Sequence, residues 1–383
     1  MTKSHQLNKQ KDGGSMQYPK ISMKATAVAI ILLVVAGCQE PEITMDDRLE
    51  EVLQEELAHH DGKGVSAAVL MPDDELWLGV AGISHEATRI TQDMMFNIAG
   101  ATKIFTAALV LDLVEDNILS INDPISKWLP DLENVDSTIL IVQLLNHTSG
   151  VYNFSAHPSL ADVTMADPSK IWTPQEVIES FVLEPHFAPG AAFAYSETGY
   201  LLLGLIVESA TGSDFETILK ERILDPVGLQ RTSLGESELA PGENSHPWGD
   251  IDDDGELDDF SFLMPVKESI FWVGGGMNAT AEDLIMFLRA LMEGGIIGPA
   301  SLDEMLRFRY YGYNSSYGLG IGESTLPDGA YSIGYNSSLY GSTETLCYLP
   351  ELDVYFSILQ NTSDWDMKRC IMSSFMEIIR EYY

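Results

Sequence analysis

The sequence predicts an α/β fold, in which one antiparallel sheet is built from both ends of the chain, is flanked by helices and is interrupted by an all-helical insertion. Two observations support this prediction. Strand-like segments with turn residues between them occur near both ends, at residues 65–83 and 317–360. Between them, apolar residues recur at helical spacing, and short loops with Pro and Gly separate the helical segments. This order of elements favours a single sheet assembled from both termini.

The first elements follow from apolar spacing and turn chemistry. Leu49, Val52, Leu53 and Leu57 recur at helical intervals, so residues 46–60 are predicted to form an amphipathic helix. The next two segments alternate like strands and are separated by a Pro-Asp-Asp turn, which predicts a hairpin of strands 65–71 and 75–83.

The remaining elements fall into a helical middle and a mixed C-terminal part. The middle predicts helices at residues 103–116, 138–145, 173–182, 197–210 and 215–223. The C-terminal part predicts a helix at 280–292, strands at 317–323, 330–336, 342–349 and 353–360, and a closing helix at 365–382. We therefore expect one domain over residues 46–383, with a sheet-containing part (46–100 and 270–383) and a mainly helical part (101–269).

The N-terminal segment is typical of an export signal. Lys20 and Lys24 precede an apolar run at residues 25–36, which is too short to span a membrane as a helix. The run ends in Val-Ala-Gly-Cys38 and resembles a bacterial lipoprotein signal, which implies cleavage before Cys38 and acylation of its sulfur. Residues 1–38 would then be the signal peptide and 39–45 a tether. We expect an exported, membrane-anchored protein on the periplasmic or cell-surface face, and an ordinary secretory signal is the alternative.

The charge of the chain argues against one class of partner. The formal net charge is −37 at pH 7, and such a surface repels phosphate backbones, so nucleic-acid binding is not expected. The acidic residues are spread along the chain, which favours a solvated acidic surface over a dedicated cation-binding block. Besides Cys38, only Cys347 and Cys370 are present; they either pair or remain buried thiols, and their spacing does not decide this.

Lys103 is the first unusual residue of the predicted core. It begins a helix that is apolar almost all round and should therefore be buried. An ammonium there loses its hydration and lies near the positive end of the helix dipole. A lysine whose stem is buried and whose head reaches the surface is the alternative. If the head is buried instead, a carboxylate partner is needed.

Five segments resemble serine β-lactamase-related proteins, in the branch that contains class C β-lactamases, DD-carboxypeptidases and related esterases. They are residues 96–131 (beginning FNIAGATK), 144–151 (LLNHTSGV), 189–212 (beginning PGAAFAYSETG), 274–295 (beginning GGGMNATAEDL) and 334–361 (beginning GYNSSLYGSTE). The resemblance runs from about residue 46 to the C-terminus and implies a serine β-lactamase-like fold.

The resemblance also implies three motifs, and this chain departs from each of them. The family's SxxK motif falls on Gly100-Ala101-Thr102-Lys103, so glycine stands where the nucleophilic serine is expected. The YxN or YxS motif falls on Tyr195-Ser196-Glu197, which keeps the tyrosine and replaces its partner by a carboxylate. The third motif, Lys or His followed by TG or a similar pair, falls on Tyr335-Asn336-Ser337, in a register set by Gly341.

These departures predict a remodelled acyl-transfer site. The backbone N–H groups of Gly100 and Ser338 would form the family's oxyanion hole, but Gly100 has no side chain to be acylated. Glu197 should form an ion pair with Lys103, and the nearby anion should keep the lysine protonated and poor as a base. Ser337 and Tyr335 add bulk where a substrate would approach. Two neighbouring hydroxyls are poor replacements, because Thr102 faces another side of the helix and Ser196 falls on a spacer position.

An acidic stretch at residues 250–259 invites a metal hypothesis. Asp250, Asp252, Asp254 and Gly255 match the opening of a DxDxDG calcium loop, in which alternating carboxylates bind the cation. The twelfth position would be Ser261 instead of a bidentate glutamate, so a plain acidic turn is the favoured alternative. No other cofactor is expected.

Two functions remain in contention. The preferred hypothesis is a lipid-anchored pseudoenzyme that uses the former acyl-transfer cleft to bind a small peptide, an ester or a cell-wall-derived ligand. Its competitor is an active hydrolase acting on a β-lactam, a D-amino-acid peptide or an ester, with another nucleophile or an activated water. A purely structural envelope protein differs from the first only in whether the cleft is open.

Overall fold

The computed structural model describes residues 43–383 except 61, 236–241, 252–253, 313–314 and 327–328. The chain divides into two units, Met1–Thr44 and Met45–Tyr383, and the second contains the helices and strands of the described residues. The predicted signal peptide, Cys38 and most of the predicted tether lie outside the described residues. Within the described part, no helix is both long enough and apolar enough to cross a membrane.

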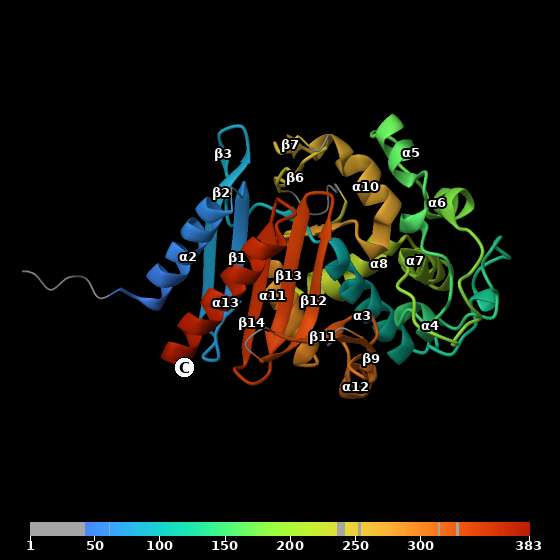
Figure 1. Ribbon diagram of the computed structural model, residues 1–383. Coiled ribbons are helices and arrows are strands. Elements are labelled where there is room, and N and C mark those ends of the chain that lie inside the picture. The colour runs from blue at the N-terminus through green and yellow to red at the C-terminus, as the bar shows by residue number, and fades with distance from the viewer. Residues whose placement is uncertain (1–42, 61, 236–241, 252–253, 313–314, 327–328) are drawn as a thin grey trace, which may run out of the picture. The chain divides into compact units, whose positions relative to one another are not determined.

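A nine-stranded antiparallel sheet joins the two ends of this unit, as predicted (Figure 1). Its strand order is β3-β2-β1-β14-β13-β12-β11-β10-β9. The bounds are β1 Gly64–Leu70, β2 Leu76–His85, β3 Thr88–Arg89, β9 Arg309–Gly312, β10 Ser315–Tyr317, β11 Gly322–Thr325, β12 Tyr331–Leu339, β13 Ser342–Leu349 and β14 Val354–Gln360. The first strand pairs with the last, with Val65 opposite Gln360, so neither half of the sequence forms the sheet alone.

Helices cover both faces of the sheet. α2 (Met45–His59) and α13 (Trp365–Tyr382) lie side by side on one face, and α11 (Ala281–Met292) packs on the other (Figure 1). Strand β1 is buried along its whole length, because Val65, Ala67 and Val69 pack toward α2 and α13 while Ala68 and Leu70 belong to the larger core. Apolar side chains on both faces explain why this strand is apolar nearly throughout.

The helical part contains α3 (Thr102–Glu115) at its centre, and most of that helix is buried. Around it are α4 (Ile141–Leu145), α5 (Leu160–Ala166), α6 (Pro174–Phe181), α7 (Glu197–Thr211), α8 (Phe215–Leu219), α9 (Asp225–Val227) and α10 (Met264–Phe271). Side-chain caps define several starts: Thr173 forms a capping box with Glu176, and Asp214 accepts a hydrogen bond from the Thr217 N–H.

Three elements differ from the sequence prediction. The predicted strand 317–323 is interrupted: residue 317 ends β10, residues 322–323 begin β11, and residues 318–321 between them turn, because Gly320 has a φ of +79° and a Cβ there would lie 2.4 Å from the Cβ of Ala107. The predicted helix 138–145 begins only at Ile141, after an extended Leu140. The mainly helical part also contains β5 (Thr232–Leu234), which joins β4 (Phe96–Asn97) and β8 (Met277–Ala279) in a small sheet.

Several short elements have no counterpart in the sequence prediction. They are α5, α10 and α12 (Pro299–Met305), the edge strand β9, and the two-stranded ribbon of β6 (Trp248–Gly249) and β7 (Asp258–Asp259). Elements this short give too few residues for a periodic pattern to emerge. Cys347 and Cys370 are both free thiols, which answers the open question of their pairing in this structure.

Candidate active site

A strained turn presents Gly100 at the start of α3. Residues Ala99–Ala101 form a 3-10 turn between β4 and the helix, and Ala99 has a φ of +43°. The buried Asn97 side chain holds this turn, since its Oδ1 accepts the Ala99 N–H at 3.2 Å and its Nδ2 donates to the carbonyls of Gly275 and Met277. A strained backbone conformation persists only where surrounding contacts enforce it, so contacts such as those of Asn97 hold the turn in place.

Side chains from β12 fill the space above Gly100. A Cβ on Gly100 would lie 2.3 Å from Cε1 of Tyr335 and 3.0 Å from Oγ of Ser337. The Gly100 N–H donates to Ser337 Oγ at 2.8 Å, so the donor expected to form an oxyanion hole with Ser338 already has an intramolecular acceptor. The side-chain hydroxyl of Ser338 is hydrogen-bonded to the hydroxyls of Ser363 and Thr343.

Lys103 and Glu197 form the ion pair that the sequence predicts. Lys103 is fully buried, and its Nζ lies 2.7 Å from Oε2 of Glu197. The same Nζ donates to the Gly274 carbonyl at 2.6 Å, and the rings of Tyr195, Tyr200 and Tyr335 surround it at 5.2, 5.4 and 5.9 Å. The charge is therefore neutralised inside the protein. The alternative, a lysine whose head group reaches the surface, is wrong.

Two opposing effects act on the pKa of Lys103. Burial lowers the pKa of Lys103 below its usual value, and Glu197 opposes this effect without overcoming it. Desolvation of a fully buried ammonium is the larger of the two effects, and the expectation that Glu197 keeps the proton on Lys103 stays a prediction.

Glu197 also engages the retained tyrosine. It is the first residue of α7, where the helix dipole favours a negative charge. Its Oε1 accepts the Tyr195 hydroxyl at 2.5 Å. Tyr195 is 40% exposed, yet burial, followed by the charge of Glu197, raises the pKa of Tyr195 well above its usual value. Tyr195 thus donates to Glu197 and is not available as a phenolate base.

Glu344 is a site residue that the sequence analysis missed. It lies on β13 directly opposite Ser337, is fully buried, and accepts the Ser337 hydroxyl at 2.6 Å. Burial raises the pKa of Glu344 to about 7, and Lys368 acts in the opposite direction. If residues are paired outward from the turn at Gly341, residue 344 lies opposite residue 337, so the hairpin register would have placed the Glu344 carboxylate beside the third motif.

His147 packs against Tyr195 and contacts the backbone beside it. It is buried, its ring lies 4.5 Å from that of Tyr195, and its Nδ1 accepts the Ser196 N–H at 3.3 Å. Burial, and then the charge of Lys103, lower the pKa of His147 well below its usual value. A neutral imidazole that accepts a backbone hydrogen bond has a positioning role for the segment Tyr195–Ser196.

The acidic stretch forms the loop of the β6–β7 ribbon. Both carboxylate oxygens of Asp250 accept backbone N–H groups, from Asp254 at 3.1 Å and Gly255 at 2.9 Å. Asp252 lies outside the described residues. The calcium site at Asp250, Asp252 and Asp254 therefore stays a prediction.

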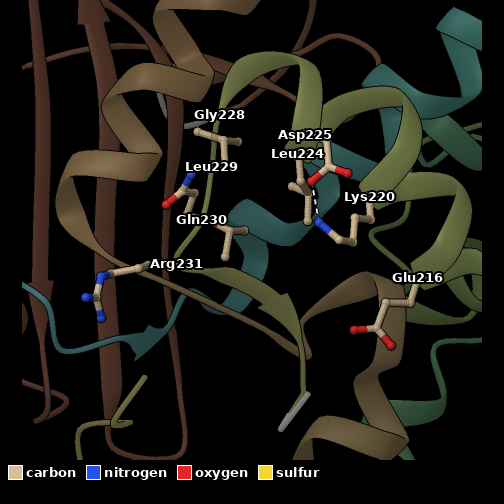
Figure 2. Close-up of a pocket in the computed structure, with 9 residues that line it drawn as sticks. Glu216, Lys220, Leu224, Asp225, Gly228, Leu229, Gln230 and Arg231 are labelled. Atoms are coloured by element: carbon tan, nitrogen blue, oxygen red, sulfur yellow. Dashed lines mark hydrogen bonds and ion pairs between the residues drawn. The ribbon is translucent and has the colours of Figure 1, made fainter. Parts of the chain in front are cut away.

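A separate cavity of about 390 Å³ lies beside α8, α9 and β5 (Figure 2). Lys220 and Asp225 form an ion pair at its wall (Figure 2), and Arg231, the residue before β5, also lines it. Its lining residues are Glu216, Lys220, Leu224, Asp225, Gly228, Leu229, Gln230, Arg231 and Thr232. It contains no residue of the three motifs, so the motif residues and this cavity do not coincide.

Comparison with known proteins agrees with this architecture. A family model described as Beta-lactamase matches residues 49–378. "Penicillin-binding protein 4*" of Bacillus subtilis (strain 168) is 25% identical over 311 residues, which are 77% of this chain and 67% of the relative. A "D-aminopeptidase" of Gluconobacter oxydans (strain 621H) is 26% identical over 249 residues, or 64% of this chain and 45% of that protein. The chain thus spans less than half of the latter's length.

Solved structures give the same result. A D-stereospecific amidohydrolase from Streptomyces sp. superposes with a TM-score of 0.76 at 27% identity, covering 88% of this chain and 99% of the other. The D-amino acid amidase from Ochrobactrum anthropi SV3, in complex with L-phenylalanine, superposes with a TM-score of 0.77 at 26% identity, with the same coverage.

Proposed function

Because the chain belongs to the β-lactamase family, we propose that it is a pseudoenzyme of that family, which has lost acyl transfer through an active-site serine and binds a ligand or partner at the former cleft. The observation that carries the proposal is the occupied space above Gly100. Acyl transfer needs a side-chain nucleophile next to an anion-binding N–H. Here position 100 has no side chain, and Tyr335 and Ser337 fill the place that one would need.

The charged groups support the same proposal. In the family's acyl-transfer site, the motif lysine and tyrosine are expected to move the proton of the nucleophile, so they must be free to accept and donate it. In this chain Lys103 and Tyr195 both contact Glu197, at 2.7 and 2.5 Å. Catalysis by the family route would have to break both contacts, which link three motif positions into one closed network.

The ligand class follows from the relatives and from the residues at the mouth. The similar proteins include enzymes named for D-amino acids and penicillin, so we propose a small peptide, an ester or a cell-wall-derived ligand. Tyr195 is 40% exposed, and Tyr335 and Ser337 are partly exposed, so aromatic and hydroxyl groups remain available for contact. Such groups suit recognition of compact ligands with both apolar and polar parts.

We also propose that the protein is exported and anchored through an acylated Cys38. The support is the basic, apolar and Val-Ala-Gly-Cys38 order of residues 20–38. Expression of the full chain in a bacterium with labelled palmitate tests this: the label should enter the protein, and the Cys38→Ser variant should lack it. Incorporation that is equal in both would refute the anchor.

A direct assay tests the loss of catalysis. The purified full chain is incubated with a chromogenic β-lactam, a short-chain nitrophenyl ester and a D-amino-acid amide, and its intact mass is recorded. We expect no adduct and no turnover above a heat-inactivated control. Turnover or a stable acyl adduct would overturn the pseudoenzyme proposal.

One observation favours the competing hydrolase. The Ser337 hydroxyl donates to the buried Glu344 carboxylate at 2.6 Å and lies beside Gly100, so this pair resembles a nucleophile with its base. Thr102 and Ser196 are both buried and bonded within the protein, which leaves Ser337 as the better candidate among the three. If an adduct forms, peptide mapping and the Ser337→Ala variant decide: loss of the adduct would assign the activity to Ser337.

A further inference from the structure

The geometry points to a zinc-binding site between the two terminal helices, formed by Glu56, His60 and Cys370. We propose that these three side chains bind Zn²⁺ through one carboxylate oxygen, one imidazole nitrogen and one thiolate. Their candidate ligand atoms all lie within 4.8 Å of one another. The site is distinct from the Gly100 cleft and does not depend on the proposed function.

The two ligands from the N-terminal part of the domain have suitable spacing. Glu56 is on α2 and His60 follows one turn later, so both side chains project from the same side. Oε2 of Glu56 and Nε2 of His60 are 3.5 Å apart. Two ligands of a tetrahedral zinc ion lie about 3.4 Å apart, which matches the spacing of these two atoms.

The third ligand comes from the other end of the chain. Cys370 is a free, partly buried thiol on α13, the helix that packs beside α2 (Figure 1). A side-chain movement of about 1 Å brings a sulfur from the 4.8 Å limit to the spacing of a bound thiolate. A zinc ion would therefore cross-link residues that are 310 positions apart in the sequence.

A second carboxylate orients the histidine for this role. Oδ2 of Asp364 lies 3.2 Å from Nδ1 of His60, while Oδ1 of Asp364 caps α13 by accepting the N–H groups of Asp366 and Met367. A carboxylate on one imidazole nitrogen, with the other nitrogen facing further ligands, is the usual outer arrangement of a histidine that binds zinc. The Asp364 contact therefore gives His60 the kind of carboxylate partner that zinc-binding histidines have.

The donor set selects zinc among the common divalent ions. Thiolate and imidazole ligands suit Zn²⁺, whereas Ca²⁺ and Mg²⁺ prefer sites made of oxygen alone. Zinc binds the thiolate form of cysteine, so it displaces the thiol proton of Cys370 when it binds. Three protein ligands leave a fourth position for water or for a group from a partner.

The test uses the full chain, freed of metal by a chelator and kept reduced by a phosphine. Zn²⁺ titration by calorimetry should give one site that is lost or weakened at least tenfold in His60→Ala and in Cys370→Ser. Co²⁺ as a probe should give a thiolate-to-cobalt absorption band that Cys370→Ser abolishes. Asp364→Asn keeps a good helix cap and should weaken binding about 10-fold to 100-fold.

Two exposed neighbours on α2 serve as matched controls. His59→Ala and Glu55→Gln change the same residue types one position away and should leave zinc affinity and the cobalt band unchanged. The proposal is overturned if no saturable site is found, if the ligand variants bind as the parent does, or if the control variants lose binding equally.

Discussion

Replacement of Glu197 by glutamine should strongly destabilise the fold, because it leaves a buried ammonium without its counter-charge. At 2.7 Å and an effective dielectric constant of about 20, the attraction between Lys103 and Glu197 amounts to about 6 kcal/mol. Some of this is offset in the variant, since Gly274 still accepts a hydrogen bond from Nζ and burial already favours a neutral lysine. We expect Glu197→Gln to lower the free energy of unfolding by about 3–5 kcal/mol.

Urea unfolding at pH 7 measures this change, and two further variants make the interpretation specific. Lys103→Met removes the charge itself, so the double variant Lys103→Met/Glu197→Gln should recover much of the loss. Glu304→Gln is the matched control, because its pair with Arg307 is a surface contact in which the arginine is 67% exposed. That control should cost less than about 1 kcal/mol.

The reasoning about the Lys103–Glu197 pair would be refuted by either of two results. One is a Glu197→Gln cost no larger than that of Glu304→Gln. The other is strictly additive behaviour of the double variant, since residues in direct contact should show a coupling energy of about 0.5–3 kcal/mol. Either result would mean that the buried lysine does not depend on Glu197.

Three further predictions follow from the same site. Gly100→Ser should lower the free energy of unfolding by about 1–3 kcal/mol through its clash with Tyr335, and the variant should gain no β-lactam adduct by intact mass. The double variant Gly100→Ser/Tyr335→Ala should recover stability. An adduct in the single variant would contradict the prediction that the site stays inactive. Tyr195→Phe should cost about 1 kcal/mol in urea unfolding by removing a donor to Glu197, and an unchanged midpoint would argue against that contact. Glu344 has a folded-state pKa of about 7, raised above its usual value of 4.5, so its contribution to stability falls as pH rises from 4.5 to 7. The stability of Glu344→Gln relative to the parent should therefore increase over that window. A difference in stability that does not change with pH would refute the raised pKa of Glu344.

Much of the fold could be predicted because its long elements carry periodic apolar patterns. The helix after Lys103, the terminal helices and the paired strands β1, β13 and β14 all have patterns long enough to read. The segment 317–323 was predicted as one strand although a turn at 318–321 interrupts it, since its strand-like composition gave no sign that Gly320 must pass close to α3. Short caps, ribbons and edge strands depend on such contacts between distant segments and escape local patterns.

The candidate site shows the same division. The three altered motifs, and with them the pairing of Lys103 with Glu197, could be inferred from residue types in register with a known family. Glu344 was missed because a glutamate in a strand is usually exposed; the hairpin register places it opposite Ser337, but only the packed structure shows that it is buried there.

By itself, the sequence determined that position 100 is a glycine and therefore has no hydroxyl of its own. Only the tertiary structure decided what takes that space, how a buried lysine is neutralised, and that Glu56 and His60 meet Cys370 from the opposite end of the chain. The physical reason is that residue types are local properties, whereas burial, distance and electrostatic environment arise when strands and helices far apart in sequence pack against one another.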